Sequence, residues 1–411
     1  MAPTQSGIVA IVEVKRAAIT AYQRTALIFA DVWYRICTPR HRRGEISWVV
    51  GPDDIASMVQ QISRAIPRSF SVSMFPHASY TENYDYFIRA PRDSRRAFWF
   101  RIVIGPWLLA RLAHRAKGFI YVGATGFLAD FDARAHEFAY VKRRGRGLVC
   151  YWTGSDIRST RRMNELERET GMPNISTYIS LVAPVLGTDA WEEGRRRLAA
   201  VADRYADAMF SNSVDHLSYL EASTEPFLYF LDDDIVGDLT KFDAIERPVL
   251  VHATTSPIIK GTPLVRAAVA KLRHEGYAFE YIELIGVPNS VVRSELRRAH
   301  IALNQFYGFN PTVFGCEALA AGAVVMMSSD EHVETDLPPG SNQAWVVTKH
   351  YEVYDKLKDL LDNPERWRAI AERGIAWARE NALVSGTAPR LHRVLNAVLD
   401  GTYTPPRRRD A

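Results

Sequence analysis

Short apolar runs rich in β-branched and aromatic residues recur along the first half of the chain, and stretches with helical spacing separate them. The runs are "ISWVV" (46–50), "FSVSM" (70–74), "GFIYV" (118–122), "GLVCYW" (147–152) and "AMFSN" (208–212). Apolar strands that alternate with helices are typical of a parallel sheet covered by helices on both faces. The pattern therefore predicts a doubly wound α/β domain.

The second half of the chain repeats this scheme. Its predicted strands are "PVLVH" (248–252), "AFEYIEL" (278–284), "HIALNQ" (300–305), "AVVMMS" (323–328) and "QAWVV" (343–347). Between the halves lies the polar and acidic stretch "FLDDDIVGDLTKFDAIERP" (230–248), which ends in a proline and is typical of an interdomain linker. The chain is therefore predicted to hold two Rossmann-like domains.

The same pattern sets the expected domain boundaries. We expect a helical extension over residues 1–43, an amino-terminal domain over 44–235, a linker over 236–247 and a carboxy-terminal domain over 248–385. Residues 386–411 are expected to form a last helix and a disordered basic tail, "TPPRRRDA". A length of 411 residues also makes two domains the default, because one core rarely covers so long a chain.

Composition narrows the class of protein. Hydrophobic residues make up 47% and charged residues 24% of the chain, as in ordinary globular proteins. The formal net charge of +4 is small for this length and argues against nucleic acid as a partner. The three cysteines form no C-x-x-C pair, and we find neither a signal-peptide pattern nor a long uncharged apolar stretch. We therefore expect a cytoplasmic protein without a disulfide framework or a zinc site.

A lysine stands where the first strand of the second half gives way to a helix. In "HATTSPIIKGTPLVRAAVAKL" (252–272), Lys260 and Gly261 precede a helix that is expected to begin near Thr262 and Pro263. Ligands of doubly wound sheets bind at the carboxyl ends of the strands, where helix N-termini offer free N–H groups. Lys260 is therefore expected to face an anion, and the alternative is a solvated lysine before an ordinary helix.

A carboxylate marks a second candidate site, in "NQFYGFNPTVFGCEALAAGAVVMMS" (304–328). A loop that contains Gly308 and Asn310 leads into a helix that carries Glu317 among apolar residues, and Gly322 ends that helix. A buried carboxylate needs hydrogen-bond donors, and the two neighbouring hydroxyls of a ribose supply a pair of them. Glu317 is thus a candidate for ribose binding, and the alternative is a hydrogen bond from a nearby loop N–H.

Together with "IGVPNSVVRSELRRAHIALNQF" (285–306), these two stretches resemble the nucleotide-sugar half of retaining GT-B glycosyltransferases of the family-4 type, in the same order and spacing. The resemblance implies the GT-B fold, in which two Rossmann-like domains face each other across a cleft. It implies transfer of a sugar from a nucleoside diphosphate to an acceptor hydroxyl with retained configuration and without a metal or other cofactor.

The resemblance also implies which residues bind the donor. Lys260 would neutralise the diphosphate, Val287 of the "VP" loop would lie beside the base, and Glu317 would hold the ribose. The implied donor-binding residues are Thr255, Lys260, Gly261, Val287, Gly308, Thr312, Val313 and Glu317.

The chain departs from the family's pattern at three positions. Phe309 stands where relatives usually carry a second glutamate, which contacts the transferred sugar. Thr255 replaces an arginine that often doubles the charge on the diphosphate, and Thr153 replaces a histidine near the reacting sugar. These departures leave open a second class of function, a catalytically weak nucleotide- or glycan-binding protein that acts as a sensor or assembly subunit.

Three residues are the candidate catalytic groups. Lys260 would stabilise the negative charge that grows on the leaving diphosphate. Asn310 could contact the sugar, and Asp156 could orient the acceptor, because "CYWTGSDIRS" (150–159) resembles the family's cleft-facing "HGSD-R" loop. The alternative for Asp156 is to cap the helix that follows it.

Other signals for a metal or a dinucleotide are weak. The triplets "DFD" (130–132) and "DDD" (232–234) have the D-x-D spacing by which GT-A glycosyltransferases hold a metal, but they fall in a helical run and in the linker. We therefore expect solvated carboxylates there. The histidines show no metal-ligand spacing, and no glycine-rich stretch completes G-x-G-x-x-G, so neither a metal nor a dinucleotide cofactor is expected.

Two segments mix basic and large apolar residues. Residues 8–36 place Lys15, Arg16, Arg24 and Arg35 among isoleucine, leucine, phenylalanine, tryptophan and tyrosine, and "RHRRG" follows at once. Residues 92–118 hold six arginines and two tryptophans. Such helices are typical of the surface of an anionic bilayer. We predict peripheral attachment to the inner face of the plasma membrane, with a glycan or lipid-linked acceptor. The alternative is that both helices pack on the amino-terminal sheet and that their arginines pair with acidic side chains.

Overall fold

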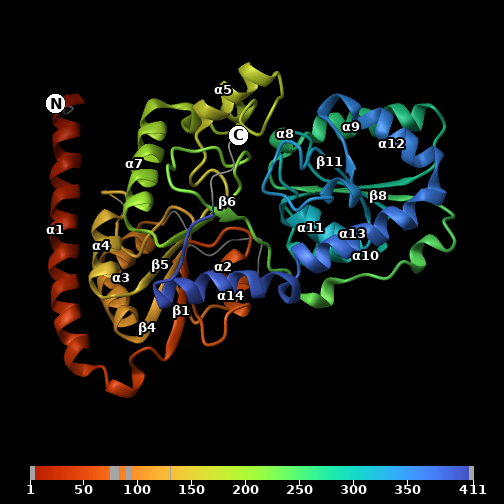
Figure 1. The fold of residues 1–411 in the computed structure, drawn as a ribbon. Coiled ribbons are helices and arrows are strands. Elements are labelled where there is room, and N and C mark those ends of the chain that lie inside the picture. The colour runs from red at the N-terminus through yellow and green to blue at the C-terminus, as the bar shows by residue number, and fades with distance from the viewer. Residues whose placement is uncertain (1–4, 75–82, 89–93, 130, 407–411) are drawn as a thin grey trace.

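The computed structural model describes residues 5–74, 83–88, 94–129 and 131–406. It contains two separate parallel sheets, one in each half of the chain, with helices on both faces of each (Figure 1). The predicted α/β fold of two doubly wound domains is therefore confirmed. The end of the predicted basic tail, residues 407–411, and Asp130 of "DFD" lie outside the described residues.

The amino-terminal sheet has seven strands in the order β3-β2-β1-β4-β5-β6-β7, and each neighbouring pair is parallel. The strands are β1 (Ile46–Pro52), β2 (Phe70–Ser73), β3 (Tyr86–Phe87), β4 (Ala116–Val122), β5 (Gly147–Tyr151), β6 (Ala208–Ser211) and β7 (Glu225–Pro226). In the register, Val49 of β1 pairs with Phe70 on one side and Phe119 on the other. The edge strands β3 and β7 of this sheet were not predicted.

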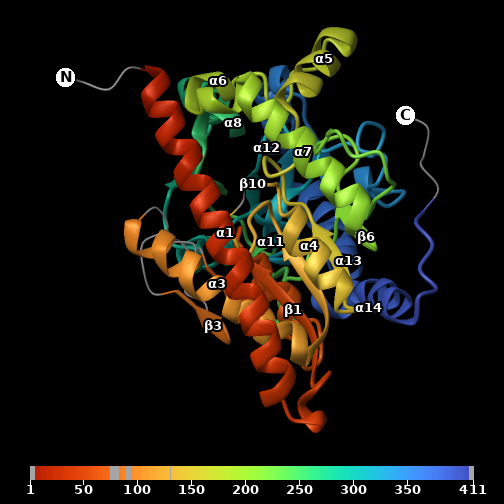
Figure 2. The ribbon, with the colours of Figure 1, turned by 90° about the vertical axis from the view of Figure 1, so that its left-hand side faces the viewer.

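Seven helices belong to this half of the chain within the described residues. They are α1 (Gln5–Cys37), α2 (Met58–Arg64), α3 (Arg95–Arg115), α4 (Ala135–Arg143), α5 (Thr160–Thr170), α6 (Ile179–Val182) and α7 (Asp189–Tyr205). Buried residues of α3, α4 and α7, such as Leu109, Phe138 and Ala199, cover one face of the sheet. The long helix α1 lies outside α3 and packs on it through Leu27 and Ala30 (Figure 2).

The carboxy-terminal sheet has five parallel strands in the order β12-β11-β10-β8-β9. They are β8 (Val249–Thr254), β9 (Glu280–Ile285), β10 (Ile301–Leu303), β11 (Val324–Met327) and β12 (Val346–Val347). The helices are α8 (Pro257–Lys260), α9 (Thr262–His274), α10 (Asn289–Arg298), α11 (Thr312–Ala320), α12 (Val353–Asp362) and α13 (Trp367–Asn381). One face is covered through Leu296 and Leu319, and the other through Val265 and Leu357.

The last helix, α14 (Val384–Asp400), returns to the amino-terminal domain and runs beneath it in Figure 1. Its Leu391 and Leu395 are buried in one cluster with Trp48 and Val50 of β1, so α14 and α2 cover the second face of the amino-terminal sheet. The sequence predicted a helix here but not the domain on which it packs. Within the described residues, no helix is long and apolar enough to cross a membrane.

Candidate functional site

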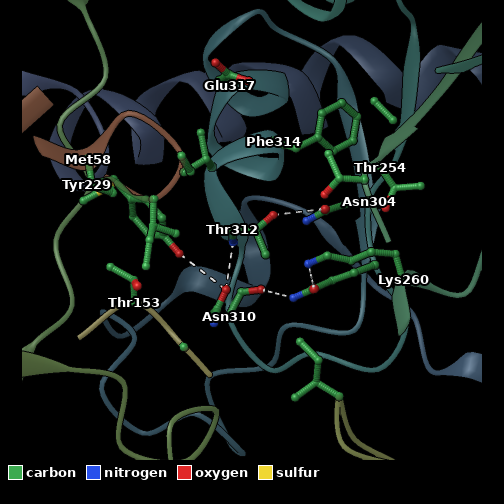
Figure 3. Close-up of a pocket in the computed structure, with 18 of the residues that line it drawn as sticks. Met58, Thr153, Tyr229, Thr254, Lys260, Asn304, Asn310, Thr312, Phe314 and Glu317 are labelled. Carbon is green, nitrogen blue, oxygen red and sulfur yellow. Dashed lines mark hydrogen bonds between the residues drawn. The ribbon is translucent and has the colours of Figure 1, made fainter. Parts of the chain in front are cut away.

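A cavity of about 400 Å³ lies between the two domains. The loops after β1, β5 and β6 form one wall, and those after β8, β9 and β10 form the other. All strands of a parallel sheet end at the same edge, and here the carboxyl edges of the two sheets face each other. Figure 3 shows side chains from both domains around this space, among them Thr153, Lys260, Asn310 and Glu317.

Lys260 lies at the carboxyl end of β8, as predicted, and its ammonium group donates to Oε1 of Gln305. The sequence predicted a loop, but Pro257 begins a single helical turn that ends at this lysine. Gly261 then adopts a left-handed conformation (φ 80°) and directs the chain into α9. Burial lowers the pKa of Lys260 to about 8 against the attraction of Asp215, so the side chain is still a cation at neutral pH.

Glu317 lies on α11 and is buried, with 4% of its surface exposed. Both of its carboxylate oxygens accept from Nδ2 of Asn289, at 3.1 and 3.2 Å. Asn289 is the first residue of α10, directly after the Val287-Pro288 turn. The partner is thus a side-chain amide and not the loop N–H that was the alternative. Burial raises the pKa of Glu317 to about 7, which poises the group near neutral pH.

The loop before α11 is held by two polar side chains from the end of β10. Nε2 of Gln305 donates to the carbonyl oxygen of Asn310 at 2.7 Å, and Oδ1 of Asn304 accepts from the hydroxyl of Thr312 at 3.2 Å (Figure 3). The N–H of Thr312 donates to Oδ1 of Asn310 at 3.0 Å. A Cβ at Gly308 would lie 2.2 Å from Nε2 of Gln305, so a larger residue would displace this amide from its hydrogen bond to Asn310.

Asp156 is occupied within its own loop. Its carboxylate accepts from the N–H groups of Thr153 and Gly154, at 2.9 and 2.7 Å, and from the Thr153 hydroxyl at 3.1 Å. It is not part of the cavity wall. The predicted alternative of a helix cap is wrong, because Oγ of Ser159 accepts the N–H of Arg162 at the start of α5. Asp156 instead shapes the turn that presents Thr153.

Sequence analysis missed a buried carboxylate from the amino-terminal domain. Asp215 follows β6 and lines the cavity. Its Oδ1 accepts from the N–H of Phe309 at 2.8 Å, and its Oδ2 accepts from Nδ2 of Asn310 and Nη2 of Arg158, both at 2.7 Å. Burial opposes its ionisation, but Arg158 and His216 outweigh burial and lower the pKa of Asp215. The stretch "SVDH" (213–216), directly after the predicted strand 208–212, was the signal available.

A second buried carboxylate joins the domains in the opposite direction. Glu334, from the carboxy-terminal domain, accepts from the N–H groups of Ser213 and Asp215, at 3.0 and 2.6 Å, and from that of Val214. The hydroxyl of Ser213 donates to it at 2.7 Å. Burial raises the pKa of Glu334 to about 7. Two reciprocal carboxylate contacts therefore fix the cleft in the arrangement described here.

Most residues predicted from the sequence meet at this cavity. Those that line it are Thr153, Thr255, Lys260, Val287, Asn310, Thr312, Val313 and Glu317. Gly261 and Gly308 shape the backbone beside it, and Phe309 is buried behind it with its N–H on Asp215.

The acidic triplets lie elsewhere. Asp232 and Asp234 form ion pairs with Arg64 and Arg293, at 3.3 and 3.5 Å. Asp132 accepts a backbone N–H from α4 at 3.1 Å. Among the residues that the structure describes, no group of three histidine, cysteine, aspartate or glutamate side chains could hold a metal ion.

Comparisons with known proteins agree with this geometry. Residues 266–390 match the family model described as "Glycosyl transferase-like". A sucrose-phosphate synthase from Thermosynechococcus elongatus has a similar structure, with a TM-score of 0.58 at 10% identity over 87% of this chain and 100% of that one. WaaG, a glycosyltransferase involved in lipopolysaccharide biosynthesis, has a TM-score of 0.52 at 11% identity over 84% of this chain and 98% of that one.

None of the curated proteins compared matches the chain in sequence. The family match falls on the half of the chain that carries Glu317 and its neighbours, and the structural likeness covers both domains and the cleft between them. The chain therefore has the GT-B fold, and its residues 266–390 are similar to the glycosyl transferase-like family.

Proposed function

We propose that this protein transfers a sugar from a nucleoside diphosphate donor to an acceptor hydroxyl, with retained configuration. The observation that carries the proposal is that Lys260 and Glu317 reach one cavity from neighbouring strand ends of the same sheet. A partly buried cation and a buried carboxylate suit the two polar parts of a nucleoside diphosphate, the diphosphate and the ribose diol. Val287, beside Glu317 in the same wall, leaves an apolar surface for the base.

The chain's own groups supply what the reaction needs. Negative charge grows on the diphosphate as the sugar leaves, and Lys260 would stabilise it together with the N-terminal N–H groups of α9. The side chain of Asn310, held by Asp215 and Thr312, is fixed where it can position the sugar. Retention rests on the family resemblance, as does the expectation that no metal or other cofactor takes part.

The departures at Phe309 and Thr153 favour a second candidate, a nucleotide- or glycan-binding protein with little activity. The Phe309 side chain is buried and supplies no polar group where relatives have a glutamate. Thermal stabilisation by a panel of UDP-, GDP- and ADP-sugars would identify the donor, and transfer to candidate acceptors would then be compared with donor hydrolysis. Transfer with an inverted product anomer would contradict retention, and binding without transfer would support the second candidate.

We further propose that the enzyme works at an anionic membrane surface, in the assembly of a surface polysaccharide or glycolipid. The outer faces of α1 and α3 lie next to each other (Figure 2), and both expose large apolar side chains. Phe29, Trp33 and Trp99 are 66%, 57% and 54% exposed. Basic residues on the same two helices are exposed as well, including Arg16 and Arg96. Apolar insertion combined with basic charge fits an anionic bilayer.

The predicted alternative, packing on the sheet with paired arginines, also has support. The opposite stripe of α1 is buried against α3, and Arg35 pairs with Asp31 at 3.3 Å. Sedimentation with phosphatidylglycerol vesicles separates the two ideas. Replacing Phe29 and Trp33 by serine should abolish sedimentation, while Tyr351→Ser, at a 66% exposed site on the other domain, should not. No sedimentation of the native protein would refute the membrane proposal.

A further inference from the structure

The cavity holds a second cation, the arginine of the "HGSD-R"-like loop, to which the sequence analysis assigned no role. Thr255 leaves Lys260 without the arginine that often accompanies it, yet Arg158 of the amino-terminal domain lines the same cavity. Arg158 follows the β5 loop, and its side chain is 11% exposed. A guanidinium stays ionised at any pH a protein tolerates, and its planar N–H groups suit phosphate oxygens.

Asp215 holds this guanidinium by one edge. Nε of Arg158 donates to the Asp215 carbonyl oxygen, and Nη2 donates to the Asp215 carboxylate at 2.7 Å. Nη1 makes no hydrogen bond to any residue that the structure describes. One edge of the guanidinium is therefore fixed, while the other keeps donors for a ligand.

The negative charge of Asp215 does not cancel the positive charge that Arg158 offers to a ligand. Its carboxylate also accepts the N–H of Phe309 and the amide of Asn310, so three different donors share its charge. Those two contacts tie Arg158 to the loop of the opposite domain. Arg158 also acts electrostatically on Lys260, where its charge disfavours the ammonium form. A dianion between the two cations would remove this repulsion.

We propose that Arg158, oriented by Asp215, is the second cation of the diphosphate site and replaces across the domain boundary the charge missing at Thr255. This inference rests on the proposed function, because it assigns the donor's diphosphate to the space between Lys260 and Arg158. Arg158 is then a binding residue, and Asp215 is a positioning residue that acts through it.

Calorimetry on the full-length protein tests the proposal with three probes. They are the sugar nucleotide that stabilises it most, the corresponding nucleoside, and inorganic pyrophosphate. Arg158→Gln should lower the affinity for the sugar nucleotide and for pyrophosphate about 10- to 100-fold, as expected for the loss of a hydrogen bond to a charged group. The affinity for the nucleoside should be unchanged. Arg161→Gln is the matched control, because Arg161 is close in sequence but pairs with exposed Asp189.

Asp215→Asn should lower the affinity for the same two phosphate-bearing probes, by less than Arg158→Gln does. The asparagine still accepts a hydrogen bond from the guanidinium but orients it less firmly. Arg158→Lys should recover part of the lost affinity. A merely structural role would lower the affinity for the nucleoside as well, and that result would overturn the inference.

The outcomes also separate this inference from the proposed function. If Lys260→Met loses sugar-nucleotide binding and Arg158→Gln matches Arg161→Gln, the inference fails and the proposed function stands. If the native protein binds no sugar nucleotide, the proposed function fails, and the pyrophosphate affinities of the two Arg158 variants then decide whether Arg158 serves an anion. Unchanged pyrophosphate affinity in both variants would overturn the inference.

Discussion

The affinity for a sugar nucleotide should pass through a maximum between about pH 7 and about pH 8. Two buried groups set the limits. Glu317, with a pKa raised to about 7, accepts hydrogen bonds from the ribose best when it is ionised, so binding weakens as the pH falls below about 7. Lys260, with a pKa lowered to about 8, attracts the diphosphate only as an ammonium ion, so binding weakens as the pH rises above about 8.

Each limb should have the slope of one proton. Affinity then falls about tenfold per pH unit, or about 1.4 kcal/mol, until the pKa of the group in the complex is reached. Two other titratable groups of the cavity wall titrate away from this window: the pKa of Asp215 is lowered, and burial lowers that of His216 to about 3. The product of the two limbs makes the expected profile narrow and bell-shaped.

Calorimetry across this range at constant ionic strength measures the profile. The probe should be a sugar nucleotide, because its phosphates are both esterified and do not titrate near neutral pH, unlike those of a free nucleoside diphosphate. Lys260→Gln should flatten the alkaline limb and Glu317→Gln the acid limb, each at reduced affinity. A flat native profile would refute the reasoning. An acid limb that persists in Glu317→Gln would assign it to Glu334, whose pKa burial also raises to about 7.

Three further predictions concern single side chains. Lys260→Ala should cost about 1.5–3 kcal/mol of nucleoside diphosphate binding, as for a lost hydrogen bond to a charged group, and unchanged calorimetric affinity would contradict its assignment. Glu317→Gln should lower the affinity for a ribonucleotide much more than the affinity for its deoxy analogue, because the deoxy compound has already lost one hydroxyl. Equal losses of affinity together with a reduced melting temperature would indicate a structural role. Glu334→Gln should lower the free energy of unfolding by about 1–3 kcal/mol, because the glutamine amide would turn N–H groups toward the N–H donors of Ser213 and Asp215. Denaturant titration measures this change. An unchanged midpoint would mean that the contact does not stabilise the fold.

The sequence by itself determined the architecture and the location of the site. Strand and helix periods are local properties, so ten of the strands could be predicted from short stretches. Residues that bind ligands lie in the loops and helices directly after these strands, and that position can also be read from a short stretch. For this reason the sequence alone identifies Lys260 and Glu317. The role of Asp156 was predicted less well. A carboxylate before a helix can accept hydrogen bonds from its own loop, from a helix end or from a ligand, and the neighbouring residues in the sequence do not distinguish these three partners.

Tertiary structure decided which distant side chains complete the site. Asp215 and Asn310 are 95 positions apart, and Glu334 and the N–H of Asp215 are 119 apart. The return of α14 to the first domain, where Leu391 is buried in one cluster with Trp48, is equally non-local. The carboxylate contacts form only where the carboxyl edges of the two sheets meet, and all of these contacts depend on complementary surfaces that no single stretch of sequence contains. For that reason the proposed role of Arg158 follows from the arrangement of the two domains and not from any single stretch of sequence.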